Sequence, residues 1–381
     1  MHKEVGERRD FLPELVAWLD REGASQIILE HGYGSGMDVG ESEYLEASPR
    51  ARFGDYDACL AADIVLVVRC PDEAVFERMR RGSVLFSMLH YPTRPGRVAK
   101  LMDLGIHGIS LDGLMDDEGH RLIENLRAVG WNGVREAFKQ IELNNPDFAD
   151  IDRSPIRVTV LGAGAVGSHA IAAAIRYGDP ARRESLARKG VPGVEVTVVD
   201  YDLTRFESHM LPLLERTDLL IDATYRPDAT IPVIPNPWIG SMKEGAILLD
   251  LSVDPYDFST DPPQVKGMEG IPGGTLDQWV FSPEDPAWSR LGDRVDARNR
   301  RLTLSCYSWP GIEPRDCMEL YGRQVAPMMR VLINRSVKDL DLASPDEVER
   351  AVARAEVSRW LQSVSMERDE GTFAGDRPEA P

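Results

Sequence analysis

The sequence predicts an α/β protein with two domains, each built on a parallel sheet. Its 381 residues are enough for two domains that each have a core, and 43% apolar with 28% charged residues is ordinary for a globular chain. Apolar runs of strand length alternate with stretches of helical periodicity. In mid-chain one such run leads directly into glycines spaced Gly-x-Gly-x-x-Gly. This alternation is typical of parallel sheets covered by helices.

Charge and composition argue against several classes of partner. A formal net charge of −19 opposes binding to nucleic acid or to an anionic membrane, because both need clustered Lys and Arg. No apolar run approaches the roughly 20 residues that span a bilayer, and the start MHKEVGERRD lacks the apolar segment of a signal peptide. The four cysteines and seven histidines show no metal-binding spacing. We therefore expect a cytoplasmic protein that uses no metal ion and binds neither membrane nor nucleic acid.

The first domain is predicted over residues 1–143. Its buried strands are expected in the runs SQIILEHG, ADIVLVVR, SVLFSMLH and GIHGISLDG. A helical pattern over 118–143 is long enough to carry the chain to the next domain, and NNPDFADIDRSP follows it as a linker.

The second domain is predicted over residues 144–305, and a helical segment at 306–368 is expected to pack back on the first domain. The second domain's strands are expected in RVTVLGAGAVG, VEVTVVD, DLLIDATY and AILLDLS, before an irregular stretch rich in Gly and Pro at 255–300. A helix is expected from Pro314 to about Asn334, and a last one after the Ser-x-x-Glu capping pattern at Ser344. Residues 369–381 are expected to form a flexible tail.

The glycine motif lies between a strand pattern and a helix pattern, which is the context that a dinucleotide site requires. Gly162 permits the tight turn, Gly164 lets the backbone approach a pyrophosphate, and Gly167 lets the helix pack closely on the strand. Ala165 and Val166 complete the loop at the helix N-terminus, which faces the anion. The sequence therefore predicts the pyrophosphate-binding loop of a Rossmann dinucleotide domain.

The next strand ends in Asp200, where the Rossmann fingerprint expects a carboxylate that binds the ribose hydroxyls; Tyr201 follows it in the expected cofactor site. A carboxylate here repels a 2′-phosphate, which favours NAD over NADP. Gly167 and Asp200 are 33 positions apart, whereas about 20 is usual, and RYGDPARRESLARKGVPG accounts for the excess. Two alternatives stay open: Asp200 could be a turn residue, and Arg205 is a cation that could tolerate NADP.

Several further pieces stand in a recognisable order. Lys3-Glu4 and Glu7-Arg8-Arg9 are followed by ADIVLVVRCP, SVLFSMLHYP, the glycine loop, MKEGAILLDLSVD and SWPGIEPRDC. In this order and spacing the chain resembles the alanine dehydrogenase and transhydrogenase superfamily, which includes lysine-forming saccharopine dehydrogenase. The resemblance implies two Rossmann-like doubly wound domains with a cleft between them. It also implies that an oxo acid lies in this cleft, over the nicotinamide, and is reductively aminated.

The resemblance assigns three candidate residues directly. Arg9 matches the arginine that clamps the substrate carboxylate, with the adjacent Arg8 as the alternative. His90 matches the catalytic histidine of the family. An imidazole ordinarily has a pKa of about 6.5, which suits proton transfer. Taken alone, a His that ends an apolar strand is more often structural, but its interval from Arg69 favours the catalytic role. Asp254 matches a carboxylate that favours a cationic intermediate, with a turn cap before Pro255 as its alternative.

Arg69 departs from the family, which has a lysine at this position. Arginine stays charged, so Arg69 can serve as an anion clamp but not as a general base. The lysine-dependent saccharopine mechanism is therefore in doubt here, and the substrate could carry a second acidic group.

These observations predict an NAD(H)-dependent amino-acid or opine dehydrogenase that reduces an imine formed from an oxo acid and ammonia or an amino acid. Two other classes stay open: a non-catalytic or regulatory NAD-binding protein, and a lyase like the cyclodeaminases, with tightly bound NAD. The expected partner is a small oxo acid or amino acid. The resemblance leaves the oligomeric state open, homo-oligomers included.

Overall fold

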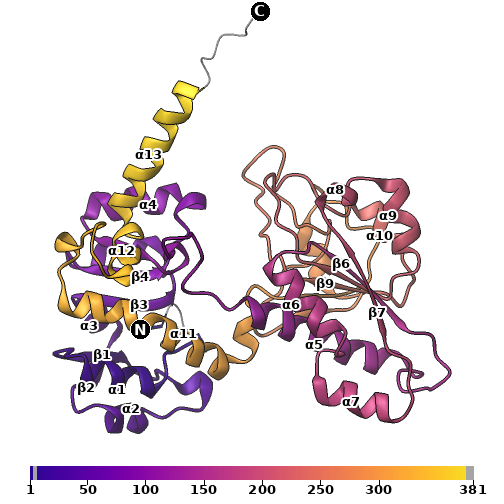
Figure 1. The fold of residues 1–381 in the computed structure, drawn as a ribbon, viewed down its shortest axis with the longest axis horizontal. Coiled ribbons are helices and arrows are strands. Elements are labelled where there is room, and N and C mark those ends of the chain that lie inside the picture. Colours follow the sequence, from indigo (N-terminus) through magenta and orange to yellow (C-terminus); the bar gives the residue numbers. More distant parts are fainter. Residues whose placement is uncertain (3–6, 375–381) are drawn as a thin grey trace, which may run out of the picture. The chain divides into compact units, whose positions relative to one another are not determined.

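The computed structural model describes residues 1–2 and 7–374 and divides the chain into two compact units (Figure 1). The first contains Met1–Glu124 and Glu313–Pro381, and the second contains Asn125–Ile312. Lys3 and Glu4, used in the resemblance, lie outside the described residues. In the described part of the chain, no helix is long and apolar enough to cross a membrane.

The described part of the first unit holds five strands in two parallel sheets. One sheet pairs β1 with β2, and the other has the order β3-β4-β5. The strands are β1 (Ile27–Glu30), β2 (Ala51–Gly54), β3 (Ile64–Arg69), β4 (Val84–Met88) and β5 (His107–Ser110). Four of them fall in the predicted apolar runs. The strand β2 was not predicted, because its four residues, ARFG, contain no apolar run.

Seven α-helices cover the described part of this unit. They are α1 (Pro13–Arg21), α2 (Glu41–Ala47), α3 (Tyr56–Leu60), α4 (Pro95–Leu104), α11 (Pro314–Asn334), α12 (Glu347–Arg354) and α13 (Val357–Ala374). The predicted helix from Pro314 is α11, which begins with its proline in the first turn. Its buried face shares one hydrophobic core with α1, through residues such as Met318, Val325 and Leu15. This packing brings the end of the chain back to its beginning.

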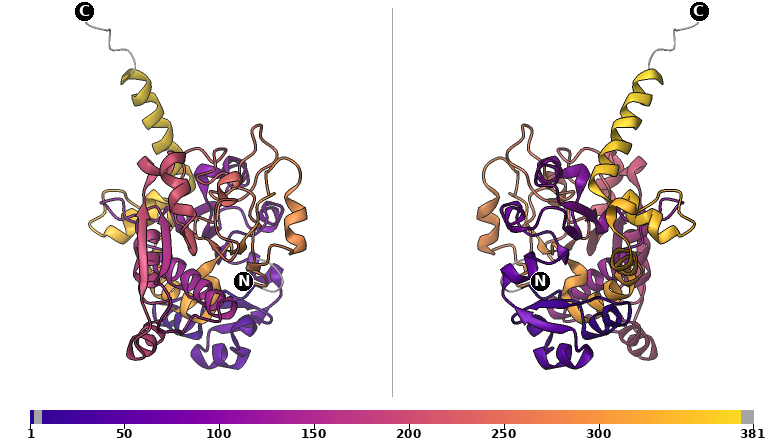
Figure 2. Two further views of the ribbon diagram at one scale, coloured as in Figure 1. Left: turned by 90° about the vertical axis from the view of Figure 1, so that its right-hand side faces the viewer. Right: turned by 90° about the vertical axis from the view of Figure 1, so that its left-hand side faces the viewer.

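The C-terminal helix differs from the prediction of a single helix capped by Ser344. Asp346 caps α12 by accepting a hydrogen bond from the Val348 N–H, while the Ser344 hydroxyl donates to buried Glu349 at 2.6 Å. A second helix, α13, projects from the unit (Figures 1 and 2) and continues to Ala374, through residues expected to form the tail. The rest of that tail, residues 375–381, lies outside the described residues.

The second unit is built on one six-stranded sheet in the order β10-β11-β9-β8-β6-β7. All its strands run parallel except the short edge strand β10. They are β6 (Ile156–Leu161), β7 (Val194–Val199), β8 (Leu219–Asp222), β9 (Ile247–Asp250), β10 (Val280–Phe281) and β11 (Leu302–Ser305). The predicted α/β class with Rossmann-like parallel sheets is therefore confirmed.

Helices cover this sheet and also mark where the structure differs from the predicted division of the chain. They are α5 (Leu126–Asn144), α6 (Ala165–Ala174), α7 (Pro180–Arg188), α8 (Tyr201–Thr204), α9 (Glu207–Leu214) and α10 (Asn236–Ile239). The Asn125 side chain caps α5, and a Cβ at Gly130 would lie 2.8 Å from the Ala170 nitrogen of α6. Because α5 packs so closely on α6, it belongs to the second unit. The extra residues before Asp200 form α7.

Candidate active site

The glycine loop has the geometry that its motif requires. Gly162 has a φ of +88°, and its N–H donates to the Val199 carbonyl of β7 at 2.8 Å. A Cβ at Gly162 would lie 2.8 Å from the Ala223 carbonyl oxygen, and one at Gly167 would lie 2.0 Å from the Gly162 carbonyl oxygen. Neither position can accept a larger residue without moving the backbone.

Gly164 is different, because open space surrounds the position of its missing side chain. No neighbouring heavy atom of the described chain comes within 4 Å of a Cβ built there, and Gly164 itself is the N-cap of α6. A helix N-terminus that opens to free space through a glycine suits a pyrophosphate group. These residues therefore fit a dinucleotide, with Ala165 and Val166 in the first turn of the helix.

Replacement of Gly164 by valine is expected to weaken NADH binding without unfolding the chain. The φ of −66° at Gly164 suits any residue, and the added side chain would fill the open space. We expect the Kd for NADH to rise by at least about tenfold, or ~1.4 kcal/mol, as measured by fluorescence titration. Gly167→Ala is the matched comparison, because it should lower the melting temperature. An unchanged Kd in Gly164→Val would contradict the assigned loop.

Asp200 lies beside this loop, because Val199, which precedes it, binds Gly162. One carboxylate oxygen, Oδ1, accepts the Tyr201 N–H at 2.8 Å and caps α8, and both residues are exposed. The Arg205 guanidinium lies over the Phe206 ring at 5.0 Å. Asp200 therefore caps a helix, as a turn residue would. It also presents an exposed carboxylate at the position where the ribose of the cofactor is expected.

The arginines of the first unit surround an internal carboxylate, which the sequence analysis did not anticipate. Arg9 is buried and donates through Nε and Nη2 to the two oxygens of Glu7, both at 2.9 Å. Arg69, at the end of β3, reaches Glu7 at 3.4 Å, whereas Arg8 is exposed. Burial opposes ionisation of Glu7, but the hydrogen bonds and charge of Arg9 lower its pKa to about 2. These three side chains carry a net charge of +1.

His90 follows β4 and forms a pair with Asp112, which follows β5. His90 Nδ1 lies 3.1 Å from Asp112 Oδ2, and the His90 N–H donates to Oδ1 at 3.2 Å. The Asp112 carboxylate is mostly buried, with 11% of its side chain exposed, while the imidazole is half exposed. Burial opposes ionisation of Asp112, but hydrogen bonds from His90 and Ser110 lower its pKa to about 2. A carboxylate on one ring nitrogen fixes the imidazole orientation and leaves Nε2 directed to exchange protons.

His90 also has a φ of +51°, in the left-handed region. A side chain other than glycine rarely adopts this conformation, and such outliers concentrate at functional sites. The structure thus places the predicted histidine in a strained turn and holds it there through Asp112.

Asp254 follows a second strained turn and is held by an arginine. Val253 has a φ of +61°, which is unusual for a β-branched residue. Arg226 is buried and donates to Asp254 Oδ2 through Nη2 at 2.7 Å and Nε at 3.2 Å. The Asp254 side chain stays one-third exposed. Its negative charge is therefore largely offset by Arg226, which the sequence analysis did not single out.

Below that turn, two buried carboxylates share one hydroxyl. Ser252 Oγ lies 3.2 Å from Asp222 Oδ2 and 3.1 Å from Asp250 Oδ1. A hydroxyl has one proton, so the second contact is favourable only if one carboxyl is protonated. Asp250 is the ionised partner, because Lys266 Nζ contacts it at 2.7 Å and the Ser305 hydroxyl at 2.9 Å. Burial and the neighbouring charge of Asp250 raise the pKa of Asp222 to about 6.

Comparisons with known proteins match two segments of this chain to one family. Residues 3–127 match the alanine dehydrogenase/PNT N-terminal domain, and residues 149–256 match the alanine dehydrogenase/PNT C-terminal domain. The chain belongs to the alanine dehydrogenase/PNT family. The predicted family is confirmed, and so is the predicted class of enzyme, an oxidoreductase.

Individual members of the alanine dehydrogenase/PNT family are distant relatives. An alanine dehydrogenase from Mycobacterium tuberculosis is 25% identical over 268 residues, which cover 64% of this chain and 68% of that protein. The NAD(P) transhydrogenase subunit alpha of Haemophilus influenzae is 21% identical and covers 86% of this chain and 64% of its own. A solved L-alanine dehydrogenase has a TM-score of 0.69 at 19% identity and covers 93% of both chains, which shows the shared fold.

Asp222 should give the stability of this family member a distinctive pH dependence. A carboxyl whose pKa is about 6 when folded and about 3.8 when unfolded holds more protons in the native state between these values. The contribution of Asp222 to the free energy of unfolding should therefore be largest below pH of about 3.8 and be lost as pH rises through about 6, a total change of about 3 kcal/mol.

Asp222→Asn should remove this dependence, because an amide stays neutral and can still accept from Thr224 and donate to Ser252. Urea unfolding at pH 4.5 and pH 7.5 measures the effect. Asp202→Asn, which changes an exposed carboxylate of α8, is the control and should behave as wild type. The same pH dependence in Asp222→Asn and wild type would contradict the assignment.

Phe281 and Trp288, two aromatic residues of the irregular 255–300 region, are buried in the core. Among the described residues, Asp116, Glu118 and His120 bring three potential metal ligands together. Asp116 there accepts the backbone N–H groups of Glu118 and His120, which explains the cluster as a turn.

Proposed function

We propose that this chain is an NAD(H)-dependent dehydrogenase of amino acids or opines. It would reduce an imine formed from an oxo acid and ammonia or an amino acid, and in reverse it would deaminate its product oxidatively at a CH–NH group. The observation that carries the proposal is the Gly162–Gly167 loop, whose open Gly164 suits a dinucleotide, in a chain of the alanine dehydrogenase/PNT family. The exposed carboxylate of Asp200 beside this loop favours NAD over NADP.

Arg9 and Arg69 are proposed to bind the carboxylate of the oxo acid. Both donate to Glu7, which brings two guanidinium groups together at one place, and guanidinium groups are well suited to bind a carboxylate. Arg69 is the more accessible of the two, with 26% of its side chain exposed against 6% for Arg9. We therefore assign the direct contact with substrate to Arg69 and the support of Glu7 to Arg9.

His90 is proposed to transfer the proton that accompanies reduction. When bound, NADH supplies the hydride. The imidazole can deliver a proton to the developing amine or remove one in the reverse direction, since Asp112 fixes its orientation and stabilises its protonated form. Asp254 is proposed to favour the iminium cation with the fraction of its charge that Arg226 leaves unbalanced.

A second candidate, a regulatory NAD-binding protein, is favoured by one observation. Glu7 already occupies the guanidinium groups of Arg9 and Arg69, as a bound substrate carboxylate would. In that case the chain would bind NADH without turnover.

An NADH-oxidation assay separates these functions. Pyruvate, oxoglutarate and glyoxylate are each supplied with ammonia in one set and with amino acids in the other. Turnover with ammonia supports simple amination, and turnover only with amino acids supports an opine product. NADH binding with no turnover in either set would contradict the dehydrogenase and support the regulatory protein.

We also propose that the protein works in the cytoplasm. Its four cysteines are buried free thiols, and thiols stay reduced in that compartment.

A further inference from the structure

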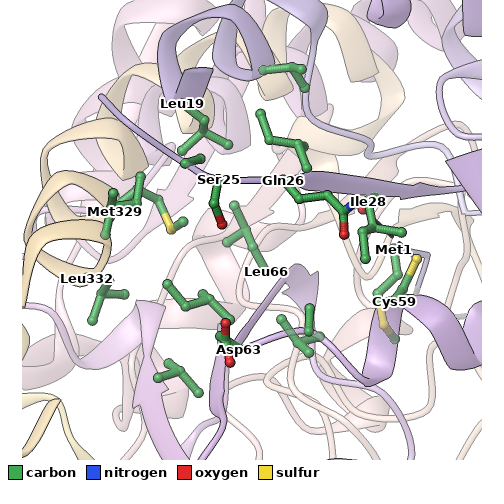
Figure 3. Close-up of a pocket in the computed structure, with 18 of the residues that line it drawn as sticks. Met1, Leu19, Ser25, Gln26, Ile28, Cys59, Asp63, Leu66, Met329 and Leu332 are labelled. Atoms are coloured by element: carbon green, nitrogen blue, oxygen red, sulfur yellow. Dashed lines mark hydrogen bonds between the residues drawn. The ribbon is translucent and has the colours of Figure 1, made fainter. Parts of the chain in front are cut away.

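Two buried features lie outside the residues that the proposed reaction uses. One is a cavity of about 760 Å³ in the first unit, whose lining includes the apolar side chains of Leu19, Leu66 and Met329 (Figure 3). The other is the pair of carboxyl groups of Asp222 and Asp250 in the second unit, both nearly inaccessible to solvent. These carboxyl groups end the neighbouring strands β8 and β9, and β8 pairs with the strand that leads into the glycine loop. The pair is therefore placed to act on the cofactor loop.

Asp222 holds the chain after β8 against the glycine loop. Its Oδ1 accepts two hydrogen bonds from Thr224, one from the N–H at 3.0 Å and one from the hydroxyl at 2.6 Å. These bonds fix the turn that follows β8. The backbone of this turn contacts the loop, since a Cβ at Gly162 would lie 2.8 Å from the Ala223 carbonyl oxygen and 3.3 Å from the Thr224 Cα. The Asp222 carboxyl therefore supports the backbone against which the cofactor loop packs.

The other oxygen, Asp222 Oδ2, faces the turn that follows β9. It lies 3.2 Å from Ser252 Oγ, which in turn lies 3.1 Å from Asp250 Oδ1. Asp250 Oδ1 also accepts the N–H of Val253, the residue with positive φ directly before Asp254. One chain of hydrogen bonds thus joins the turn at the glycine loop to the turn that carries the proposed catalytic carboxylate.

The protonation state of Asp222 decides whether this chain of hydrogen bonds is complete. A protonated Asp222 donates through Oδ2 to Ser252, and the Ser252 hydroxyl then donates to ionised Asp250. An ionised Asp222 would also need that hydroxyl proton, so one of the two carboxylates would be left without a donor at Ser252. Two like charges in a buried place also repel each other strongly, and we expect the two turns to move apart.

The charged groups around Asp222 favour its neutral form. Asp250 is the ionised neighbour, and its Oδ2 accepts a hydrogen bond from the Lys266 ammonium at 2.7 Å. Arg226 also acts on Asp222 through its charge, but its hydrogen bonds go to other groups. Burial and then the charge of Asp250 raise the pKa of Asp222 to about 6, although the hydrogen bonds from the following turn oppose this. The charge of Asp222 therefore changes within about one pH unit of this value.

We propose that Asp222 is a positioning residue for the cofactor, and that its neutral carboxyl holds the glycine loop and the Asp254 turn in the form that binds NADH. The inference rests on the proposed function, because it assumes that NADH binds at the open Gly164. NADH then binds together with a proton, and ionisation of Asp222 weakens the binding. Because its side chain is fully buried, Asp222 acts through the two turns and not by contact with the cofactor.

NADH titrations of the wild type and of Asp222→Asn at several pH values test the proposal. The Kd of the wild type should rise by at least about tenfold from pH 6 to pH 8, because the fraction of protein with neutral Asp222 falls. Asp222→Asn should have nearly the same Kd at both pH values, since its amide stays neutral and can donate to Ser252. Calorimetry in two buffers of different ionisation enthalpy should show proton uptake on binding at pH 7.5 by the wild type, and none by Asp222→Asn.

Asp228 offers a matched control. It accepts the N–H and the hydroxyl of Thr230 at 2.9 Å and 2.6 Å, as Asp222 does from Thr224, but Asp228 is exposed. Asp228→Asn should therefore keep the pH dependence of the wild type. Thr224→Val removes a hydroxyl that favours ionised Asp222, so it should move the rise in Kd to higher pH. This variant tests the proposal even if Asp222→Asn does not fold.

The outcomes separate this inference from the proposed function. A wild type that binds NADH with the same Kd at pH 6 and pH 8 would overturn the role of Asp222 alone. The same pH dependence in Asp222→Asn and wild type would also overturn it, because another group would then supply the proton. The absence of NADH binding at both pH values would overturn the proposed function, and this inference with it.

Discussion

Replacement of His90 by asparagine is expected to lower kcat for imine reduction by about 10²–10⁴-fold, the usual contribution of a general acid. Asparagine is preferred to alanine here, because His90 has a left-handed backbone, which asparagine tolerates well. Its amide can still donate to Asp112, so the turn should keep its conformation. The amide cannot transfer a proton at neutral pH, and kcat is the quantity to measure under saturating substrates.

The controls separate proton transfer from folding and cofactor binding. His120 also pairs with an aspartate, Asp116, but it lies on an exposed turn, and His120→Asn should leave kcat unchanged. NADH binding by His90→Asn should match wild type. A wild-type kcat in His90→Asn would show that another group supplies the proton.

In the proposed mechanism, Asp112 acts through His90 and is a positioning residue. Asp112→Asn should lower kcat by at least about tenfold by removing the charge that stabilises the protonated imidazole. A purely structural role of Asp112 would instead lower the free energy of unfolding and leave kcat unchanged.

The parts of the fold that the sequence predicted are those with a strong local pattern. The glycine loop joins a strand of β-branched residues to a helix, and every feature of it lies within twelve residues, 156–167. In contrast, β2 has four residues and β10 has two, which is too short for a recognisable strand pattern, so only their pairing with β1 and β11 makes them strands. The helix α5 differs from both. Its helical periodicity could be recognised in the sequence, but the sequence did not show that it packs on the second unit.

The candidate site shows the same limit. His90 and Asp254 could be assigned from the resemblance, whereas their partners lie far along the chain. Asp112 is 22 residues from His90, and Arg226 is 28 residues from Asp254. Asp112 is an acidic residue just after an apolar strand run, which was a usable signal. No sequence pattern indicated that Glu7 would bind both Arg9 and Arg69. The contact with Arg69 forms only because the fold places the end of β3 next to the start of the chain.

Replacement of Lys266 by methionine is expected to destabilise the second unit by about 3–5 kcal/mol, the cost of leaving a buried charge unpaired. Lys266 and Asp250 are both nearly inaccessible, with 4% and 1% of their side chains exposed, and their charged atoms lie 2.7 Å apart. Methionine fills a similar volume, so the lost cation rather than a cavity dominates the effect. Urea unfolding at pH 7.5 measures it.

The pH dependence and a double variant identify the cause. Burial opposes ionisation of Asp250, but Lys266 holds its pKa below the ordinary value. A lowered pKa stabilises the fold above the unfolded pKa of about 3.8, and this contribution is lost as pH falls. The cost of Lys266→Met should therefore be largest at neutral pH and shrink toward pH 4. Lys266→Met with Asp250→Asn removes both charges and should recover most of the loss, whereas an equally unstable double variant would show that packing around Lys266 is responsible.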